Sequence, residues 1–273
     1  MKRFQIGYQL YSAREDAQKD LCKTLKRLAE IGYDGVEFAG LYGNSVGKVK
    51  TALAEAGLKA FSAHVPYAEF TANMDGTIST YKALGCSYIV VPYLDEATRP
   101  GSAGFAKVCQ NIWIFAEKCS AAGIQLLYHN HDFEFVKLSG EYGLDFLYDL
   151  LPERLLKTEI DTCWVKYAGE DPAAFLKKYA NRAPIIHLKD YVGVKGGASP
   201  YALIGLDEDK KHDNVAFTFK PFGFGCQDAK AILCAASDTI ADILVIEQDE
   251  SVERPALDSA EMSYSTLKKL GIC

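Results

Sequence analysis

The chain has 273 residues, of which 49% are hydrophobic and 24% are charged, and its formal net charge is −6 at pH 7. This length suits one large α/β domain or two small ones. We expect no membrane span, because no apolar run approaches the ~18–20 residues that a bilayer requires. The acidic charge argues against a nucleic-acid partner, whose phosphates attract a basic face.

The N-terminal residues and the cysteines favour a cytoplasmic protein. The first residues, MKRFQIGYQLYS, lack the long apolar region and cleavage site of a signal peptide. Eight cysteines are scattered without paired spacing. This pattern indicates reduced, mostly buried thiols and not a disulfide framework.

A recurring unit dominates the chain: an amphipathic helix ends at a glycine, and a short apolar strand follows. Four helices end in this way, at Gly32, Gly57, Gly85 and Gly123. Glycine adopts the left-handed conformation that ends a helix at low steric cost. Strands that are apolar throughout are typical of parallel strands covered on both faces. The spacing of roughly 30 residues predicts a βα repeat.

In chain order, a first strand is expected at 4–10 and a first helix at 21–31. Later strands are expected in LLKTEIDTCWV, APIIHLKDYV and ADILVIEQDE, with helices at 144–151, 172–179, 228–236 and 256–270. Eight strands and eight helices then fill residues 1–273, which predicts an α/β fold: a single-domain (βα)8 TIM barrel. A doubly wound sheet is the alternative, but its glycine-rich phosphate loop is missing.

One long irregular segment, 193–225, follows the seventh predicted strand. It contains the glycine-rich stretches GVKGGASP and FGFG. We expect it to be an active-site loop that can move.

Polar side chains cluster at the predicted carboxyl ends of the strands, where TIM barrels carry their active sites. They are His64 on the third strand, His129 and His131 on the fifth, Glu159 and Asp161 on the sixth, His187, Lys189 and Asp190 on the seventh, and Glu247, Asp249 and Glu250 on the eighth. Residues two apart in a strand point the same way. Four successive strands therefore offer His129, Asp161, His187 and Glu247 to one point, a donor set that suits Mn²⁺, Zn²⁺ or Co²⁺.

Each of these residues also has a simpler explanation. A single histidine at a strand end is usually a hydrogen-bonded structural residue. Asp161 and Asp190 can cap the helices that follow them, and the acidic stretch EQDE can be a solvated rim. The metal hypothesis depends on the joint arrangement, because four consecutive apolar strands all end in groups that bind metals.

The stretches YHNHDFEF, EIDTCWV, IIHLKD and VIEQDE resemble the xylose isomerase-like TIM barrel superfamily, and most of all its sugar phosphate isomerase/epimerase branch. The resemblance extends over essentially the whole chain. It implies a divalent metal ion (Mn, Zn, Co or Mg) held by Glu, Asp, His and Glu on strands five to eight. Asp161, His187 and Glu247 match the last three positions. His129 stands where many members have glutamate, so Glu134 is an alternative ligand, and His131 matches the family's substrate-side histidine.

The same resemblance implies carbon-acid chemistry on a small carbohydrate. Glu247 or His131 would remove a proton beside a carbonyl, and Lys189 would stabilise the developing oxyanion. His64 and Glu37 are expected to bind sugar hydroxyls, or else to form hydrogen bonds at the barrel mouth. Trp164 is expected to stack on a sugar face.

Three functions remain open at this stage. The first is an isomerase or epimerase of a keto sugar or inosose, acting through an enediolate. The second is a lyase, which dehydrates an inosose or cleaves a 3-keto-glycoside. The third is a degenerate barrel or a DNA-repair relative, which the acidic charge disfavours. Barrels of this type often form homo-oligomers, so self-association is a further expectation.

Overall fold

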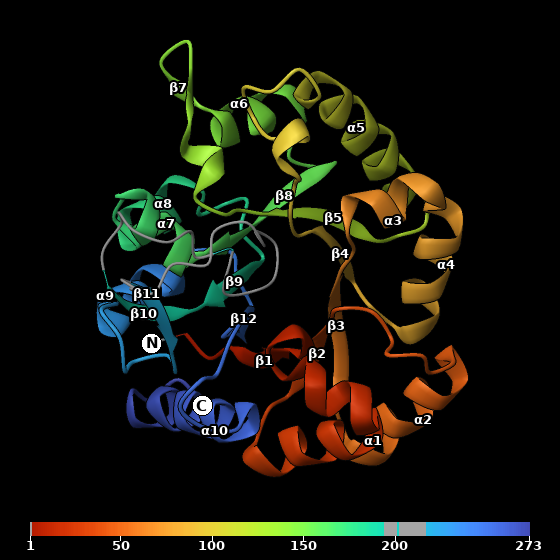
Figure 1. Cartoon of the computed structure of the whole chain (residues 1–273), viewed down its shortest axis with the longest axis vertical. Coiled ribbons are helices and arrows are strands. Elements are labelled where there is room, and N and C mark those ends of the chain that lie inside the picture. Colours follow the sequence, from red (N-terminus) through yellow and green to blue (C-terminus); the bar gives the residue numbers. More distant parts are fainter. Residues whose placement is uncertain (1, 194–200, 202–216) are drawn as a thin grey trace.

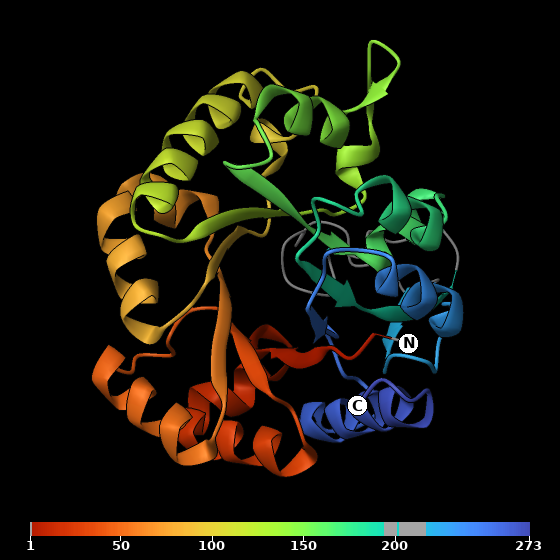
Figure 2. The same cartoon turned by 180° about the vertical axis from the view of Figure 1, so that it is seen from behind.

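Parallel strands close into a barrel of eight in the part of the chain that the structure describes, in the order β1-β12-β9-β8-β5-β4-β3-β2. The structure is a computed structural model, and it describes residues 2–193, 201 and 217–273. Figure 1 shows the helices as a ring around the strands. Seen from behind in Figure 2, the first and last parts of the chain lie side by side, because β1 pairs with β12 to close the barrel.

The barrel strands are short, and nearly all of their residues are buried. They are β1 (Gln5–Gln9), β2 (Gly35–Phe38), β3 (Lys59–His64), β4 (Tyr88–Val91), β5 (Gln125–His129), β8 (Leu156–Asp161), β9 (Ile185–Leu188) and β12 (Ile243–Ile246). The helices around them are α1 (Arg14–Ile31), α2 (Val46–Ala56), α3 (Tyr67–Ala72), α4 (Met74–Leu84), α5 (Phe105–Ala121), α6 (Gly143–Leu150), α7 (Thr162–Ala168), α8 (Pro172–Lys178), α9 (Ala229–Ser237) and α10 (Ala256–Lys269).

Local sequence signals fix the ends of several helices. The Ser45 side chain accepts a hydrogen bond from the Lys48 amide and caps α2, and Asp228 caps α9 in the same way. Gly57 and Gly85 follow α2 and α4 with φ values of 71° and 95°. This left-handed conformation ends the helix and turns the chain into the next strand.

The barrel interior is apolar at one end and polar at the other. Its apolar cluster consists of Phe61, Val90, Leu127, Ile185, Ile243 and Val245. A bulge on β3 adds one residue, since Val36 pairs with Ala60 whereas Glu37 pairs with Ser62. The bulge lets Phe61 join the apolar cluster while Ser62 donates a 2.5 Å hydrogen bond to Glu37. Polar side chains therefore concentrate toward the carboxyl ends of the strands.

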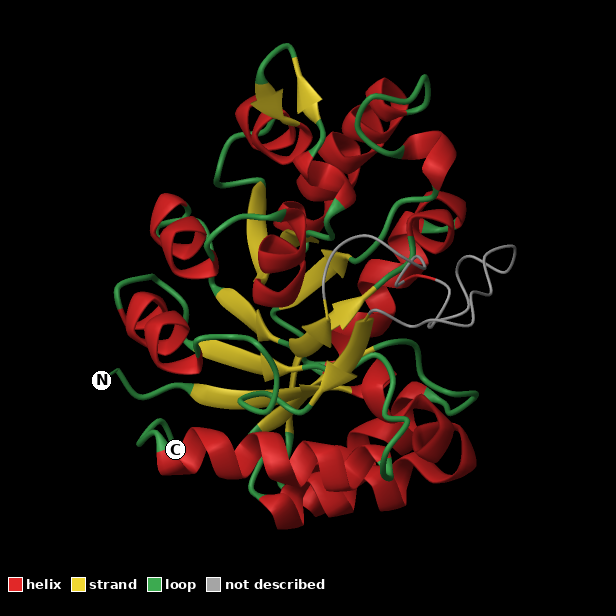
Figure 3. Ribbon diagram, turned by 60° about the vertical axis from the view of Figure 1, so that its left-hand side comes forward, coloured by secondary structure: helices red, strands yellow, loops and turns green. Residues whose placement is uncertain are grey.

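The predicted (βα)8 barrel is confirmed, and several local features differ from the sequence prediction. Helix α1 begins at Arg14 and has a kink at Asp20, where φ is −159° and ψ is 94°. Helices α3 and α7 were not predicted. Neither were two hairpins, β6 (Lys137–Leu138) with β7 (Glu141–Tyr142), and β10 (Asp190–Gly193) with β11 (Phe217–Lys220). The hairpin β6–β7 projects from the barrel in Figure 3.

The segment predicted as a mobile loop, 193–225, is described only in part. Strand β11 occupies one portion of it. Residues 194–200 and 202–216 lie outside the described residues. Among the helices of the described chain, none combines the length and apolar character needed to cross a bilayer.

Candidate active site

A cavity of about 490 Å³ lies at the mouth of the barrel. It is lined by Tyr11, Ala39, Gly40, His64, Pro66, Tyr67, Ala68, Glu69, Pro92, Tyr93, Asp95, His129, His131, Lys189, Glu247 and Asp249. All of these residues lie at or just beyond the carboxyl ends of barrel strands. The cavity thus occupies the face on which TIM barrels build their active sites.

Two overlapping groups of four side chains at this mouth are able to hold a metal ion. We call His129, Asp161, His187 and Glu247 the outer group, and His64, His129, Glu159 and His187 the inner group. In each group the donor atoms lie within 4.8 Å of one another, and every member is buried. The outer group is the predicted metal site. The inner group contains Glu159, which was not among the predicted site residues.

The outer group comes from four strands that are neighbours in the barrel, β5, β8, β9 and β12. His129 Nε2 lies 3.7 Å from Asp161 Oδ2, and His187 Nδ1 lies 3.0 Å from Glu247 Oε2. Two imidazoles and two carboxylates suit a borderline divalent cation.

Asp161 provides a specific test of whether these residues fit a cation. Its Oδ1 accepts a 2.9 Å hydrogen bond from the Trp164 amide and caps α7, as its simpler explanation predicted. Its Oδ2 is buried and has no hydrogen-bond partner in the described part of the chain. A buried carboxylate oxygen without a partner is costly, so the outer group fits a cation at this atom. Burial raises the pKa of Asp161 to about 7, although Lys189 opposes the shift.

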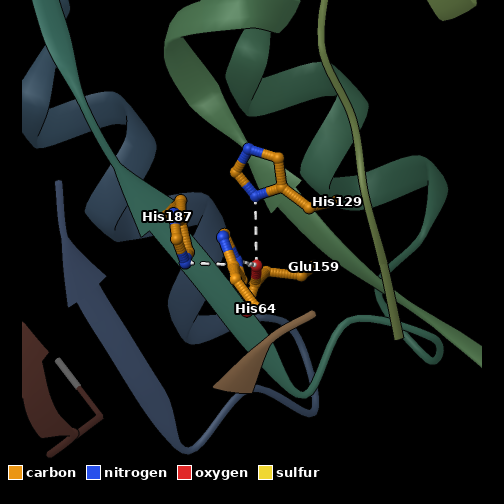
Figure 4. A group of neighbouring side chains, drawn as sticks. All are labelled: His64, His129, Glu159 and His187. Carbon is orange, nitrogen blue, oxygen red and sulfur yellow. Dashed lines mark hydrogen bonds and ion pairs between the residues drawn. The ribbon is translucent and has the colours of Figure 1, made fainter. Parts of the chain in front are cut away.

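The inner group has the spacing of a hydrogen-bonded cluster (Figure 4). Oε2 of Glu159 lies 2.6 Å from His64 Nε2, 3.0 Å from His129 Nδ1 and 3.2 Å from His187 Nε2. Oε1 of Glu159 is buried without a hydrogen-bond partner among the described residues. Glu159 thus lies beneath the outer group and contacts both of its histidines.

The hydrogen bonds around the inner group orient His129 and His187 in the way that a metal in the outer group would require. His129 then donates from Nδ1 to Glu159 while its Nε2 faces Asp161. His187 donates from Nε2 to Glu37 Oε1, at 2.8 Å, while its Nδ1 faces Glu247. Histidines that bind metals commonly donate their second ring N–H to a carboxylate in this way. We therefore assign the outer group as the candidate metal centre, and Glu159 and Glu37 as the carboxylates that orient its histidines.

His64 and Glu37, which were expected to bind sugar hydroxyls, form hydrogen bonds within the barrel. Glu37 is fully buried and also accepts a 2.7 Å hydrogen bond from Gln9 Nε2. His64 Nε2 lies 2.9 Å from Glu37. Burial lowers the pKa of His64, but the charges of Glu37 and Glu159 outweigh burial and raise it to about 10. The structure thus agrees with the alternative explanation for Glu37, whereas His64 still lines the cavity.

Lys189 is a buried cation beside the outer group. Its Nζ lies 2.7 Å from Asp249, 3.1 Å from Glu247 and 3.6 Å from Asp161. Burial opposes the charged form, but these carboxylates hold its pKa well above the usual range. Burial likewise opposes the charged form of Glu247, but the charge of Lys189 holds the pKa of Glu247 well below its usual range. A fixed positive charge therefore lines the cavity next to the candidate metal centre.

His131 lines the cavity beyond the end of β5. Burial, together with the charge of Lys189, holds its pKa well below the usual range, so the ring is neutral. Its Nδ1 has no hydrogen-bond partner among the described residues. Glu134 accepts a 2.8 Å hydrogen bond from the His131 amide and a 2.7 Å bond from the Tyr128 hydroxyl. These bonds keep Glu134 out of both metal-capable groups, contrary to its alternative role as a ligand.

Trp164 packs inside an aromatic cluster and has no side-chain surface open to solvent. Its ring stacks at 5.3 Å from the Tyr201 ring and at 6.2 Å from the Phe217 ring. Trp164 is fully buried and does not line the cavity, so the expected stacking on a sugar is not supported. It lies instead under Lys189, whose Nζ is 5.1 Å from the ring centroid. Tyr11, Tyr67 and Tyr93 are the aromatic residues that line the cavity.

Comparison with known proteins identifies the family. The model of the family described as xylose isomerase-like TIM barrel matches residues 25–269. An inosose dehydratase from Geobacillus kaustophilus is 24% identical over 190 residues, which are 62% of this chain and 61% of that protein. The chain therefore aligns with about three-fifths of the length of this relative.

Solved structures share the fold over nearly the whole chain. A sugar phosphate isomerase/epimerase from Parabacteroides distasonis has a TM-score of 0.79 and 19% identity, with coverage of 97% of this chain and 98% of that chain. The IOLI protein, whose crystal structure has a zinc atom, has a TM-score of 0.67 and 16% identity, with coverage of 98% and 96%. At these identities the likeness establishes the fold alone.

Proposed function

The chain belongs to the xylose isomerase-like TIM barrel family, and from this membership we propose that it is a metal-dependent enzyme that takes the proton beside the carbonyl of a keto sugar or inosose. One observation carries the proposal. A buried group of two histidines and two carboxylates lies beside a buried lysine, and both adjoin the same cavity.

The residues of the outer group would hold the divalent ion, which when bound polarises a carbonyl or hydroxyl oxygen. The IOLI structure, with its zinc atom, supports metal binding on this fold. Lys189 places its fixed charge where an oxyanion develops, and a charge in a dry site stabilises an oxyanion strongly.

Two side chains reach the cavity as candidate bases, His131 and Glu247. Oε2 of Glu247 is already engaged by His187 and Lys189. His131 is neutral, and its Nδ1 has no hydrogen-bond partner among the described residues. We therefore assign proton removal to His131 and leave Glu247 as a ligand. A general base must reach the proton that it removes, and the position of His131 on the cavity wall meets this condition.

Isomerisation or epimerisation is the reaction that we propose. The proton can return to the neighbouring carbon, which gives an isomer, or to the other face of the same carbon, which gives an epimer. Dehydration is the second candidate, and two observations favour it. A relative that aligns with three-fifths of the chain is named inosose dehydratase. With a histidine, His129, in the outer group and Glu247 assigned as a ligand, His131 is the single base that we assign, so a symmetric pair of bases is not available.

Hydrogen exchange with solvent tests the proposal. A panel of keto sugars and inososes is incubated in D₂O with and without Mn²⁺, and we expect metal-dependent deuterium uptake at one carbon. Loss of water from the labelled compound identifies a dehydratase, and a retained carbon skeleton identifies an isomerase or epimerase.

Three variants make this experiment specific. Glu247→Gln should abolish exchange by removing a ligand. Lys189→Met should slow exchange and leave the metal bound, whereas Lys118→Met, at a half-exposed lysine on α5, should change neither. Metal bound at the outer group without exchange of any compound would contradict the proposal.

We also propose that the enzyme acts in the cytoplasm on a small carbohydrate, without a nucleic-acid partner. All eight cysteines are free, including the exposed Cys226, Cys234 and Cys273. Free thiols are typical of reducing compartments. The net charge of −6 disfavours binding to phosphate backbones.

A further inference from the structure

The ring of His131 is held by other aromatic rings. Its Nδ1 has no hydrogen-bond partner among the described residues. The Phe133 ring lies parallel to it, with centroids 5.3 Å apart and an interplanar angle of 6°. The Tyr93 ring packs on it edge-to-face, also at 5.3 Å. An enzymatic base is commonly oriented by a third group, and here the neighbouring rings are in position to orient it.

Arg99 contacts the same rings, although it does not line the cavity of the described chain. Its guanidinium carbon lies 4.1 Å from the Phe133 ring centroid and 5.2 Å from the Tyr93 ring centroid. It also lies 5.4 Å from the Tyr201 ring centroid, and the Tyr201 ring is 5.7 Å from the His131 ring. Arg99 can therefore influence the cavity only through the residues around it.

Hydrogen bonds fix Arg99 in this place. Its Nε donates a 2.9 Å hydrogen bond to the Leu94 carbonyl, and its Nη2 donates one to the Tyr93 hydroxyl. Its side chain is only 18% exposed, and shielding from water strengthens the attraction between a cation and aromatic rings. The carboxylate of Glu96 lies 3.9 Å away but is mostly exposed, so it contributes little.

The shape of the arginine side chain suits these contacts. A planar guanidinium packs on an aromatic face while the N–H groups at its edge still donate hydrogen bonds. The ammonium of lysine carries the same charge, but it has neither the flat face nor the fixed directions of the donors. The contacts of Arg99 therefore predict that lysine cannot replace it.

We infer that Arg99 is a positioning residue for His131: it holds Phe133 and Tyr93 in place, and these rings fix the imidazole in the orientation in which it faces the cavity. The inference rests on the proposed function for the role of His131 as the base. Its structural part, the support of the imidazole, does not depend on that function. A displacement of about 1 Å at a reacting group costs up to about a hundred-fold in rate.

Nuclear magnetic resonance tests the structural part without any substrate. The protein is labelled with ¹³C at Cε1 of its five histidines, and His131→Gln identifies the His131 signal. Arg99→Ala and Arg99→Lys should both shift and broaden this signal, whereas Arg154→Ala, at an exposed arginine, should not. Unchanged His64 and His187 signals show that each variant is folded. An unchanged His131 signal in Arg99→Ala, or full rescue by lysine, would overturn the inference.

Hydrogen exchange in D₂O with Mn²⁺ tests the effect on the reaction. For a keto sugar or inosose that exchanges, Arg99→Ala should lower the maximal rate about ten-fold to a hundred-fold and leave the half-saturating concentration nearly unchanged. In a Phe133→Leu background it should add little, because both changes act through the same ring. A shifted His131 signal with an unchanged exchange rate would overturn the positioning role. If no compound exchanges, the proposed function fails, and the His131 signal still decides whether Arg99 holds the ring.

Discussion

At the scale of single residues, His129 shows how a hydrogen bond to a carboxylate leaves the other ring nitrogen free to bind a metal. Its Nδ1 lies 3.0 Å from Glu159, so the lone pair of Nε2 is directed toward Asp161. The sequence predicted His129 as a ligand from its place at a strand end. Glu159 was not predicted as a site residue, although it lies two positions before Asp161 on the same face of the strand. The sequence does not reveal that Glu159 contacts three histidines inside the barrel, because these contacts depend on the register between strands that are far apart in the chain.

We predict that Glu159→Gln weakens metal binding by about ten-fold to a hundred-fold, because the amide cannot accept hydrogen bonds as a carboxylate does and no longer fixes His129. Calorimetric titration with Mn²⁺ measures the affinity. The control is Glu153→Gln, since Glu153 is exposed and pairs with Lys157 at 3.2 Å. An unchanged affinity in Glu159→Gln would show that the inner group does not support the metal.

Glu134 gives a prediction about pH. Burial raises its pKa from 4.5 to about 8, while hydrogen bonds from Tyr128 and His131 oppose the shift. Between these two values the folded protein keeps a proton that the unfolded chain has lost. Stability contributed by this group is therefore present below pH 4.5 and falls as pH rises toward 8, by up to about 1.4 kcal/mol per unit.

Glu134→Gln mimics the protonated side chain, so its stability should lack this dependence on pH. Urea unfolding of both proteins at several values between pH 5 and 8 measures the difference, which should grow with pH in favour of the variant. Parallel curves for the two proteins would show that Glu134 is ionised in the folded state.

At the scale of elements, Asp190 joins the β10–β11 hairpin to the turn before α9. Its Oδ1 accepts hydrogen bonds from the Tyr191 and Gln227 amides, and its Oδ2 accepts them from the Gly223 and Gly225 amides. The four distances lie between 2.8 and 3.1 Å. The sequence suggested a helix cap for this residue. The structure shows a carboxylate that organises the polypeptide around the start of the hairpin.

Asp190→Ala should lower the free energy of unfolding by roughly 3 kcal/mol, because four amides lose their acceptor and one of them belongs to the buried Tyr191. Urea unfolding measures this loss. Asp238→Ala, at the end of α9, is the control and should change stability by less than ~0.5 kcal/mol. A similarly small effect of Asp190→Ala would mean that water replaces the carboxylate.

The elements differ in how well the sequence predicted them. The strands after Gly57 and Gly85 were predicted because an amphipathic helix, a glycine and an apolar run all agree. Helix α7 was missed because its seven residues begin directly at the end of β8. The hairpin β6–β7 was missed because each strand has two residues, too few for any periodicity.

At the scale of the whole molecule, barrel closure brings β5, β8, β9 and β12 together, and it explains why residues far apart in sequence form one site. The barrel rule predicted this convergence. The rule did not predict that polar side chains would form both an outer and an inner group. Their depths depend on the register between parallel strands, which is set by long-range pairing such as Asp161 opposite His187. Nor did the rule show that Trp164 would be covered, because Tyr201 and Phe217 reach it from a distant segment.

The charges of the site also have to balance across the molecule. Five buried carboxylates lie around the two groups: Glu37, Glu159, Asp161, Glu247 and Asp249. Lys189 is the only buried lysine or arginine of the described chain. The charges of nearby carboxylates raise the pKa of both His64 and His187, and with both rings protonated the five carboxylates, when ionised, still exceed the cations by two charges. A divalent ion would reduce this excess. Buried charges need such compensation, so electrostatics and donor geometry both favour a metal in this barrel.

The position of that metal is the central claim, and diffraction measured at the absorption edge of Mn or Zn tests it most directly. A crystal grown with the ion should show one anomalous peak about 2.0–2.2 Å from Asp161 Oδ2 and in contact with His129 Nε2, His187 Nδ1 and Glu247. The peak should be absent in Asp161→Asn. A peak between His64 and Glu159, or an equal peak in the variant, would contradict the assignment of the outer group.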